Sequence, residues 1–157
     1  MPATGTVKPL LEESIEIDAP PATVWSLVSD LPRMSEWSPQ VLRSFTRGPV
    51  RLGSLLLNVN RRGLLVWPTR SKVVRFEPHS EFAFRVLDNK TIWAFHLEPT
   101  ASGTRVTQRR TTPQGTTAVS DKLVGAVMGG QESFQDELLA GMRQTLAKIK
   151  REAERAG

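Results

Sequence analysis

The sequence predicts an α+β fold in which an antiparallel sheet of six or seven strands curls around one long C-terminal helix. Three observations lead to it: short segments rich in β-branched and aromatic residues, turn residues between them, and a C-terminal stretch with apolar residues at helical spacing. One helix and one sheet must cover each other's apolar faces. Because one helix cannot fill the concave face of a twisted sheet, a cavity is expected between them.

The first elements are a strand and two short helices. Residues 12–18 alternate polar and apolar side chains, which predicts a half-buried strand. Pro20 and Pro21 follow, and proline suits the first turn of a helix because its missing N–H has no partner there. A short amphipathic helix is therefore predicted over residues 21–30, and a second small turn of helix around residues 32–37. The two tryptophans of this segment are expected to close one end of the sheet.

The middle of the chain predicts six strands connected as an antiparallel meander. The gaps between them are short and rich in glycine, proline, asparagine and aspartate, which suits hairpins. The predicted strands are Gln40–Thr46, Ser54–Arg62, Val66–Phe76, Glu81–Leu87, Thr91–Leu97 and Thr104–Thr111.

The C-terminal part predicts two helices separated by Gly129–Gly130. The first, over residues 120–128, is either a lid over a cavity with the glycine pair as its hinge or a helix docked on the core. The second runs from residue 131 to about residue 154. Gly141 lies on or near its inward side and indicates close approach by a strand or room for a ligand, since glycine weakens a helix by about 1 kcal/mol. The apolar stripe of the long helix is Phe134, Leu138, Met142, Leu146 and Ile149.

Composition indicates a single domain over residues 1–157, with its core at about residues 12–152. The chain has no cysteine, which leaves neither a disulfide nor a thiolate metal site. No segment is apolar enough to predict a secretion signal or stable membrane insertion, so a cytoplasmic protein is expected. The net charge is +5, but the basic residues form no long run, and no nucleic-acid partner is expected.

The ordered set of blocks resembles the START-like or SRPBCC superfamily and, more narrowly, bacterial polyketide cyclase/dehydrase-like proteins. The blocks are APPATVWSLVSDLPRMSEWSP, GSLLLNVNRRG, VVRFEP with EFAFRV, WAFHLEP with GTRVTQ, and GMRQTLAKIK. The resemblance implies a helix-grip (START/Bet v 1-like) fold: a seven-stranded antiparallel sheet wrapped around the C-terminal helix, enclosing a deep apolar pocket. It also implies bulky apolar ligands such as lipids, polyketides or hormones, and it indicates the fold better than the activity.

Two of the predicted strands carry the candidate pocket residues. Trp93 and Phe95 share one face of their strand and are expected to line a pocket or the core. If Val106 faces inward, so do Gln108 and Arg110, because strand residues alternate between faces. Two long polar groups in the interior are costly unless they meet each other, a carboxylate, water or a ligand. They either present donors to a ligand's carbonyl or carboxylate, or lie near the mouth and reach solvent.

The residues for catalysis are incomplete. Cyclases of the superfamily that the chain resembles carry a Trp-x-Ser-x-Arg arrangement on the strand matching WPTRSKVV, and neither alternating register of that strand supplies the full set. His96 is the one group in these strands that titrates near neutral pH, but it is expected to face outward without a triad partner. The two histidines show no metal-ligand spacing and no cofactor motif occurs, so neither a metal nor a cofactor is expected.

The function favoured by the sequence is binding of a hydrophobic small molecule, lipid-like or polyketide-like, between the sheet and the C-terminal helix. The alternatives are a polyketide cyclase or dehydratase-like enzyme, and a regulatory protein-interaction domain. Neither the ligand nor the oligomeric state follows from the sequence. The expected ligand-binding wall consists of Leu27, Leu57, Val59, Trp67, Phe84, Trp93, Phe95, Gln108, Arg110, Phe134, Leu138, Gly141 and Met142.

Overall fold

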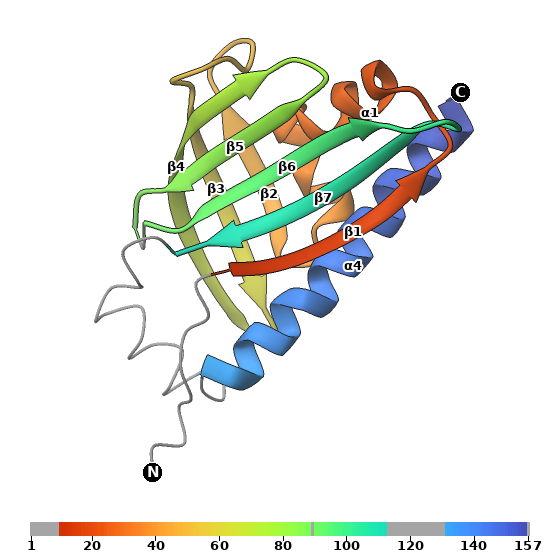
Figure 1. Ribbon diagram of the computed structural model, residues 1–157. Coiled ribbons are helices and arrows are strands. Elements are labelled where there is room, and N and C mark those ends of the chain that lie inside the picture. The colour runs from red at the N-terminus through yellow and green to blue at the C-terminus, as the bar shows by residue number, and fades with distance from the viewer. Residues whose placement is uncertain (1–9, 89, 113–130, 157) are drawn as a thin grey trace.

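The computed structural model describes residues 10–88, 90–112 and 131–156, and shows a curved sheet wrapped around a long helix (Figure 1). The helices are α1 (Pro21–Val28), the 3-10 helix η1 (Leu31–Arg33), α2 (Met34–Trp37) and α4 (Gln131–Ala156). The strands are β1 (Leu10–Ile17), β2 (Val41–Thr46), β3 (Leu55–Arg62), β4 (Leu65–Glu77), β5 (Glu81–Val86), β6 (Ile92–Pro99) and β7 (Thr104–Thr111). These elements confirm the predicted α+β helix-grip class and element order, and the helix predicted over residues 120–128 lies outside the described residues.

The seven strands form one antiparallel sheet in the order β1-β7-β6-β5-β4-β3-β2. The strands β2 to β7 make the predicted meander, and β1 joins its far edge by pairing with β7 along its whole length. Two ion pairs on the outer face match this register, because Arg105 and Arg109 of β7 each hold a glutamate of β1 at 2.6 Å. The outer face of the closing pair is therefore specified by charges, while Leu11, Ile15 and Ile17 supply apolar side chains to its inner face.

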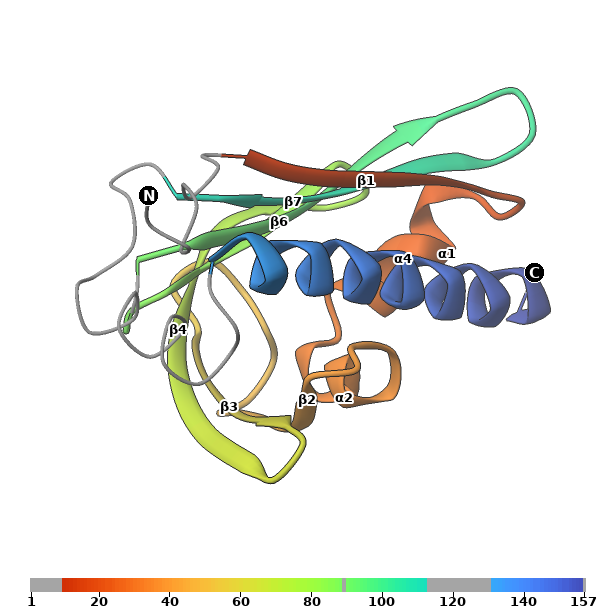
Figure 2. The same ribbon diagram turned by 90° about the horizontal axis from the view of Figure 1, so that it is seen from below.

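The helix α4 runs along the concave side of the sheet, with its C-terminal end beside α1 (Figure 2). Its buried stripe, Leu138, Met142, Leu146, Ile149 and Ala153, recurs at helical spacing. Two contacts attach its last turns to the end of β1. The Asp18 amide donates to Glu154 Oε2 at 2.9 Å, and Lys150 Nζ donates to the Glu16 carbonyl at 2.9 Å.

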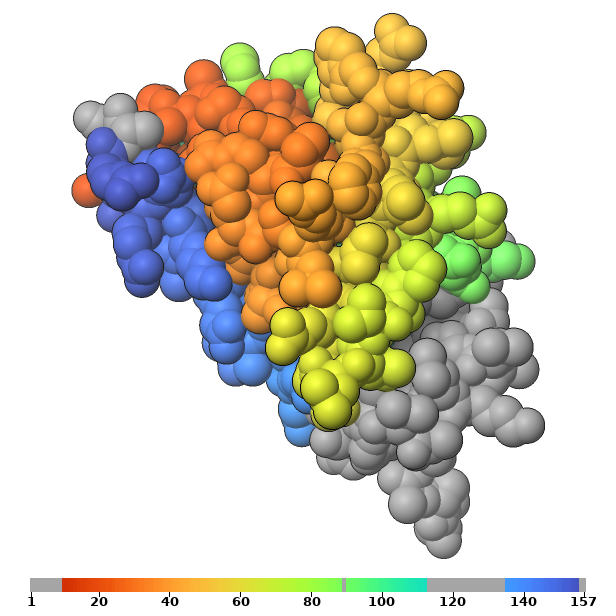
Figure 3. Space-filling view, turned by 180° about the vertical axis from the view of Figure 1, so that it is seen from behind, coloured from red at the N-terminus to blue at the C-terminus, as the bar shows by residue number. Residues whose placement is uncertain are grey.

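The sheet and the short helices enclose an aromatic core at the α1 end of the molecule. A bulge between Val73 and Arg75 shifts the alternation of β4, so that Val73 and Phe76 both face inward. Trp25 of α1 packs edge-on against Phe76, with ring centroids 5.3 Å apart. Trp37 is also buried, and the segment from α1 to α2 lies between α4 and the β2–β3 side of the sheet (Figure 3). The interior is thus filled at this end.

Candidate functional site

A cavity of about 290 Å³ lies between α4 and the sheet. One face of α4 between Glu137 and Thr145 forms one wall, and Trp93 of β6 and Gln108 of β7 line it from the sheet. Residues 38–40, after α2, and residues 61–63, at the end of β3, complete the lining. A cavity of this size and position is typical of a small-molecule site.

The wall formed by α4 is mainly apolar. Leu138 and Met142 are buried and cluster with Leu11 of β1 and Trp93. Gly141 also lines the cavity, and a Cβ added there would lie 3.4 Å from the ring Cγ of Pro39. The segment that approaches this glycine is therefore the α2–β2 loop, where the sequence suggested a strand or room for a ligand.

The strand β7 presents a buried row to the interior. Thr104, Val106, Gln108 and Arg110 are all less than 9% exposed, and they alternate with Arg105, Thr107 and Arg109 on the outer face. Gln108 and Arg110 therefore point inward, as the alternation from Val106 predicts. Their cross-strand partners on β6 are Phe95 and Trp93, which lie on the same face of the sheet.

Several polar atoms in this interior have no hydrogen-bond partner. They are the hydroxyl of Ser71, Oε1 of Gln108, and Nε and Nη2 of Arg110. Burial lowers the pKa of Arg110 to about 10. Buried polar atoms are almost always paired in proteins, so these unpaired atoms are unusual, and one of the three residues, Gln108, lines the cavity.

The strand β4 adds a second polar row on the inward face. Trp67, Thr69 and Ser71 point toward the interior, and Asn60 Nδ2 donates to the Trp67 carbonyl at 3.2 Å and to Thr69 Oγ1 at 3.0 Å. The inward register therefore reads Trp-x-Thr-x-Ser. It ends in Ser71 where the cyclase arrangement implied by the resemblance has an arginine.

Two ion pairs connect α4 to the sheet around the cavity. Arg62 of β3 holds Glu137 of α4 with two hydrogen bonds, Nε to Oε2 at 2.7 Å and Nη2 to Oε1 at 2.9 Å. The hydrogen bond to Glu137 is the main reason that the pKa of Arg62 is raised. On the other side, Arg143 of α4 lies 3.1 Å from Glu13 of β1. Both Glu137 and Glu13 thus already have arginine partners.

The structure distributes the expected wall residues over several environments. Five of them line the cavity: Trp93, Gln108, Leu138, Gly141 and Met142. Leu27, Phe84 and Phe95 belong to the main apolar core, while Trp67 and Arg110 share the inward face without lining this cavity. The side chain of Phe134 lies outside the described residues.

The predicted inward placement of Leu57 and Val59 is wrong by one residue. Leu57 is 41% exposed, whereas Asn58 and Asn60 of the same strand are buried. The asparagines face inward because they find hydrogen-bond partners there. Ser44 Oγ donates to Asn58 Oδ1 at 2.6 Å, and Asn60 Nδ2 donates to Thr69 Oγ1 of β4. Leu57 is more hydrophobic than either asparagine, so the sequence favoured burying it. An alternating pattern fits either face of a strand, however, and the pairing of β3 with its neighbours decides which face is buried.

Sequence reasoning missed most of the lining outside the apolar stripe of α4 and the two strands β6 and β7. Pro39, Arg62, Glu137 and Thr145 were not among the expected residues. Among these residues, only Thr145 could have been predicted from local sequence, because its spacing from Leu138 and Gly141 places it on the same side of α4. Arg62 and Glu137 are separated by 75 positions, so no local sequence pattern predicts their contact.

Other kinds of site find little support in the part of the chain that is described. His96 pairs across strands with the outward Thr107 and lies 4.0 Å from Glu98, so it faces away from the cavity. Residues 10–88, 90–112 and 131–156 contain no cluster of side chains that could hold a metal ion. No described helix is long and apolar enough to cross a membrane.

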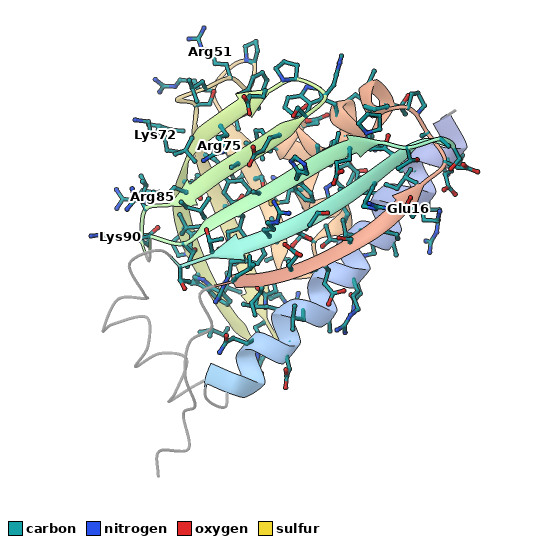
Figure 4. The ribbon with its side chains drawn as sticks, viewed as in Figure 1. Glu16, Arg51, Lys72, Arg75, Arg85 and Lys90 are labelled. Carbon is teal, nitrogen blue, oxygen red and sulfur yellow. The ribbon has the colours of Figure 1, made fainter. Side chains whose placement is uncertain are left out.

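Basic side chains gather along one end of the sheet, away from the cavity. Arg51 lies at the top of the view, and Lys72, Arg75, Arg85 and Lys90 lie toward its left side, where β5 ends and β6 begins, while Glu16 lies toward the opposite end (Figure 4). Lys72 and Arg85 are direct cross-strand partners on the outer face. This charge is therefore a property of the outer surface rather than of the interior.

The chain matches the family model described as "Polyketide cyclase / dehydrase and lipid transport" over residues 8–154. A solved relative, the Polyketide_cyc-like protein Cgl2372 from Corynebacterium glutamicum, is 31% identical. The alignment covers 92% of this chain and 91% of that one, with a TM-score of 0.65. No curated protein shows significant sequence similarity to the chain.

Two more distant structures share the fold. The Zhui aromatase/cyclase from Streptomyces sp. R1128 is 15% identical, with 93% of each chain covered and a TM-score of 0.76. The di-domain ARO/CYC StfQ of the steffimycin biosynthetic pathway is also 15% identical, with a TM-score of 0.76. The alignment covers 94% of this chain but 51% of StfQ, so the chain spans about half of that protein.

Proposed function

The chain belongs to the polyketide cyclase/dehydrase and lipid transport family, and we propose that it binds a bulky apolar small molecule in the cavity between α4 and the sheet. The observation that carries this proposal is the cavity itself: about 290 Å³, with an apolar wall on α4 and unpaired polar atoms nearby on the sheet. The lipid-like or polyketide-like character of the ligand is part of the proposal.

The two kinds of wall have different roles in binding. Trp93, Leu138 and Met142 remove ligand surface from water, and each Å² of apolar surface buried contributes about 25 cal/mol. Gln108 carries both an amide donor and an acceptor, so it orients a ligand through a carbonyl or a hydroxyl. Apolar contacts thus supply most of the affinity, and a few polar contacts supply orientation.

A cyclase-like reaction on a polyketide-like substrate is the second candidate. One observation favours it: the Ser71 hydroxyl and Nε and Nη2 of Arg110 are unpaired donors on the inner face, and such donors stabilise negative charge developing on a substrate oxygen. The reaction also needs a base. Glu137, the carboxylate among the described lining residues, already accepts both hydrogen bonds from Arg62. Binding therefore remains the proposal.

The test uses N-phenyl-1-naphthylamine, a neutral apolar probe that fluoresces when it leaves water. We expect saturable binding to the wild-type protein and at least tenfold weaker binding to Ala140→Trp, which places an indole in the cavity. Ala147→Trp is the matched control, because Ala147 is exposed on the same helix and does not line the cavity. Absence of saturable binding, or equal binding by both variants, contradicts the proposal.

A further inference from the structure

Arg110 of β7 is a buried arginine without a hydrogen-bond partner for Nε or Nη2. It is 5% exposed and lies on the inward face, between Leu11 of β1 and Trp93 of β6 as its cross-strand neighbours. An unpaired cation in such surroundings costs several kcal/mol of solvation, and most proteins avoid it by pairing the charge.

The neighbouring charges do not meet this need. Glu13, on the same face of β1, lies against Arg143, and Glu137 of α4 holds Arg62. The two other arginines of β7, Arg105 and Arg109, differ from Arg110 because each has a glutamate partner at 2.6 Å on the outer face. Among the described ion pairs, Arg110 has none.

The position of Arg110 connects it to the cavity. Gln108 precedes it by two residues on the same face, and Trp93 is its direct partner across the strands; both line the cavity. Leu138 and Met142 of α4 cluster with Leu11 and Trp93, its two strand neighbours. Arg110 itself does not line the cavity, but a ligand lying on Trp93 and Gln108 contacts the two residues that stand beside it on the inner face.

We propose that the ligand of this cavity is an apolar carboxylic acid whose carboxylate pairs with Arg110. The inference rests on the proposed function and adds the chemical class of the ligand. A carboxylate matches the planar guanidinium with two parallel hydrogen bonds, and it supplies acceptors for the two unpaired nitrogens together. The lowered pKa of the free Arg110 still leaves it protonated at neutral pH, so the pair is ionic.

The test compares acids with their uncharged amides of nearly equal shape, by displacement of N-phenyl-1-naphthylamine at pH 7.5. The probe pairs are 1-naphthaleneacetic acid with 1-naphthaleneacetamide, and decanoic acid with decanamide. Hydrogen bonds to charged groups contribute enough free energy to predict roughly ten- to hundredfold tighter binding of each acid. Equal binding of acid and amide, or failure of both acids to bind, overturns the proposal.

Three variants assign the preference to Arg110. Arg110→Met keeps an apolar side chain of similar length and is expected to abolish the preference for acids, while binding of the amides stays within about threefold. Arg110→Lys restores the charge without the planar fork, so part of the preference returns. Arg105→Met is the matched control on the outer face and leaves the preference unchanged. A preference that persists in Arg110→Met contradicts the inference.

The two proposals fail in different ways. If the neutral probe binds but acids and amides displace it equally, the cavity function stands and the carboxylate inference falls. If the neutral probe does not bind, the proposed function falls first. These outcomes come from one titration series and need no variant.

Discussion

Arg62 and Glu137, 75 positions apart, form a two-pronged ion pair that joins the end of β3 to α4 across the lining of the cavity. The pair joins the two surfaces between which we propose that the ligand binds. Both side chains are about one-third exposed, so solvent screens the pair and it is more important for access than for stability.

Glu137→Gln is expected to speed ligand exchange. The variant weakens the contact between β3 and α4, so the dissociation rate of N-phenyl-1-naphthylamine in stopped-flow displacement should rise several-fold, with little change in thermal midpoint. The matched control is Glu16→Gln, which removes an equally short ion pair far from the cavity. Equal dissociation rates in the wild type and Glu137→Gln contradict a role for this pair in access.

Arg110→Met is expected to stabilise the ligand-free protein. Folding lowers the pKa of Arg110 to about 10, which means that burial of the charge disfavours the folded state. This penalty is fully present below about pH 10 and is relieved as the pH rises above that value. Urea unfolding at pH 7 should show a gain of about 1–3 kcal/mol.

Urea unfolding of Arg105→Met shows whether the gain in stability comes from removing a buried charge or from removing any arginine of β7. Arg105 is exposed and paired with Glu16, so its loss should leave the free energy of unfolding nearly unchanged or slightly lower. A destabilised Arg110→Met would indicate that Arg110 has a partner in the folded protein, and would count against both the burial penalty and the carboxylate inference.

Gly103→Ala is expected to be severely destabilising. A Cβ on Gly103 would lie 2.1 Å from the carbonyl oxygen of Ile17 and 2.8 Å from the amide nitrogen of Ala19, and backbone atoms cannot move aside cheaply. The β6–β7 turn packs here on the link between β1 and α1, where the Thr104 hydroxyl donates to the Ala19 carbonyl at 2.7 Å. We expect a loss of at least about 2 kcal/mol in urea unfolding, and a wild-type midpoint would rule this packing out.

Gly141→Ala is expected to leave the stability of the folded protein unchanged or to raise it. Its Cβ would meet only the ring of Pro39, at ordinary contact distance, while alanine favours the helix by up to about 1 kcal/mol. Thermal unfolding should therefore show an unchanged or higher midpoint. The added methyl also narrows the cavity, so binding of decanoic acid should weaken more than that of 1-naphthaleneacetic acid if the longer chain extends past α4. A large drop in midpoint would contradict the placement of Pro39.

Local patterns predicted most of the fold. The alternation in β1, the paired prolines before α1 and the apolar stripe of α4 are features of neighbouring residues, and each produced an element close to its expected bounds. The same alternation placed Gln108 and Arg110 inside, because Val106 left one consistent face for β7. It failed for Leu57 and Val59, where hydrophobicity favoured one face and the hydrogen bonds of Asn58 and Asn60 required the other.

By itself the sequence determined the element order, the α+β class and the presence of polar groups on the inner face of β7, since these depend on periodicity within single segments. Only the tertiary structure decided which face of β3 is buried, that Pro39 approaches Gly141, that Arg62 meets Glu137, and that Nε and Nη2 of Arg110 have no hydrogen-bond partner. Those outcomes depend on strand pairing and on contacts between distant segments. The free energy of each contact depends on all the residues that meet there. Because these residues come from distant segments, no short stretch of the chain predicts the contact.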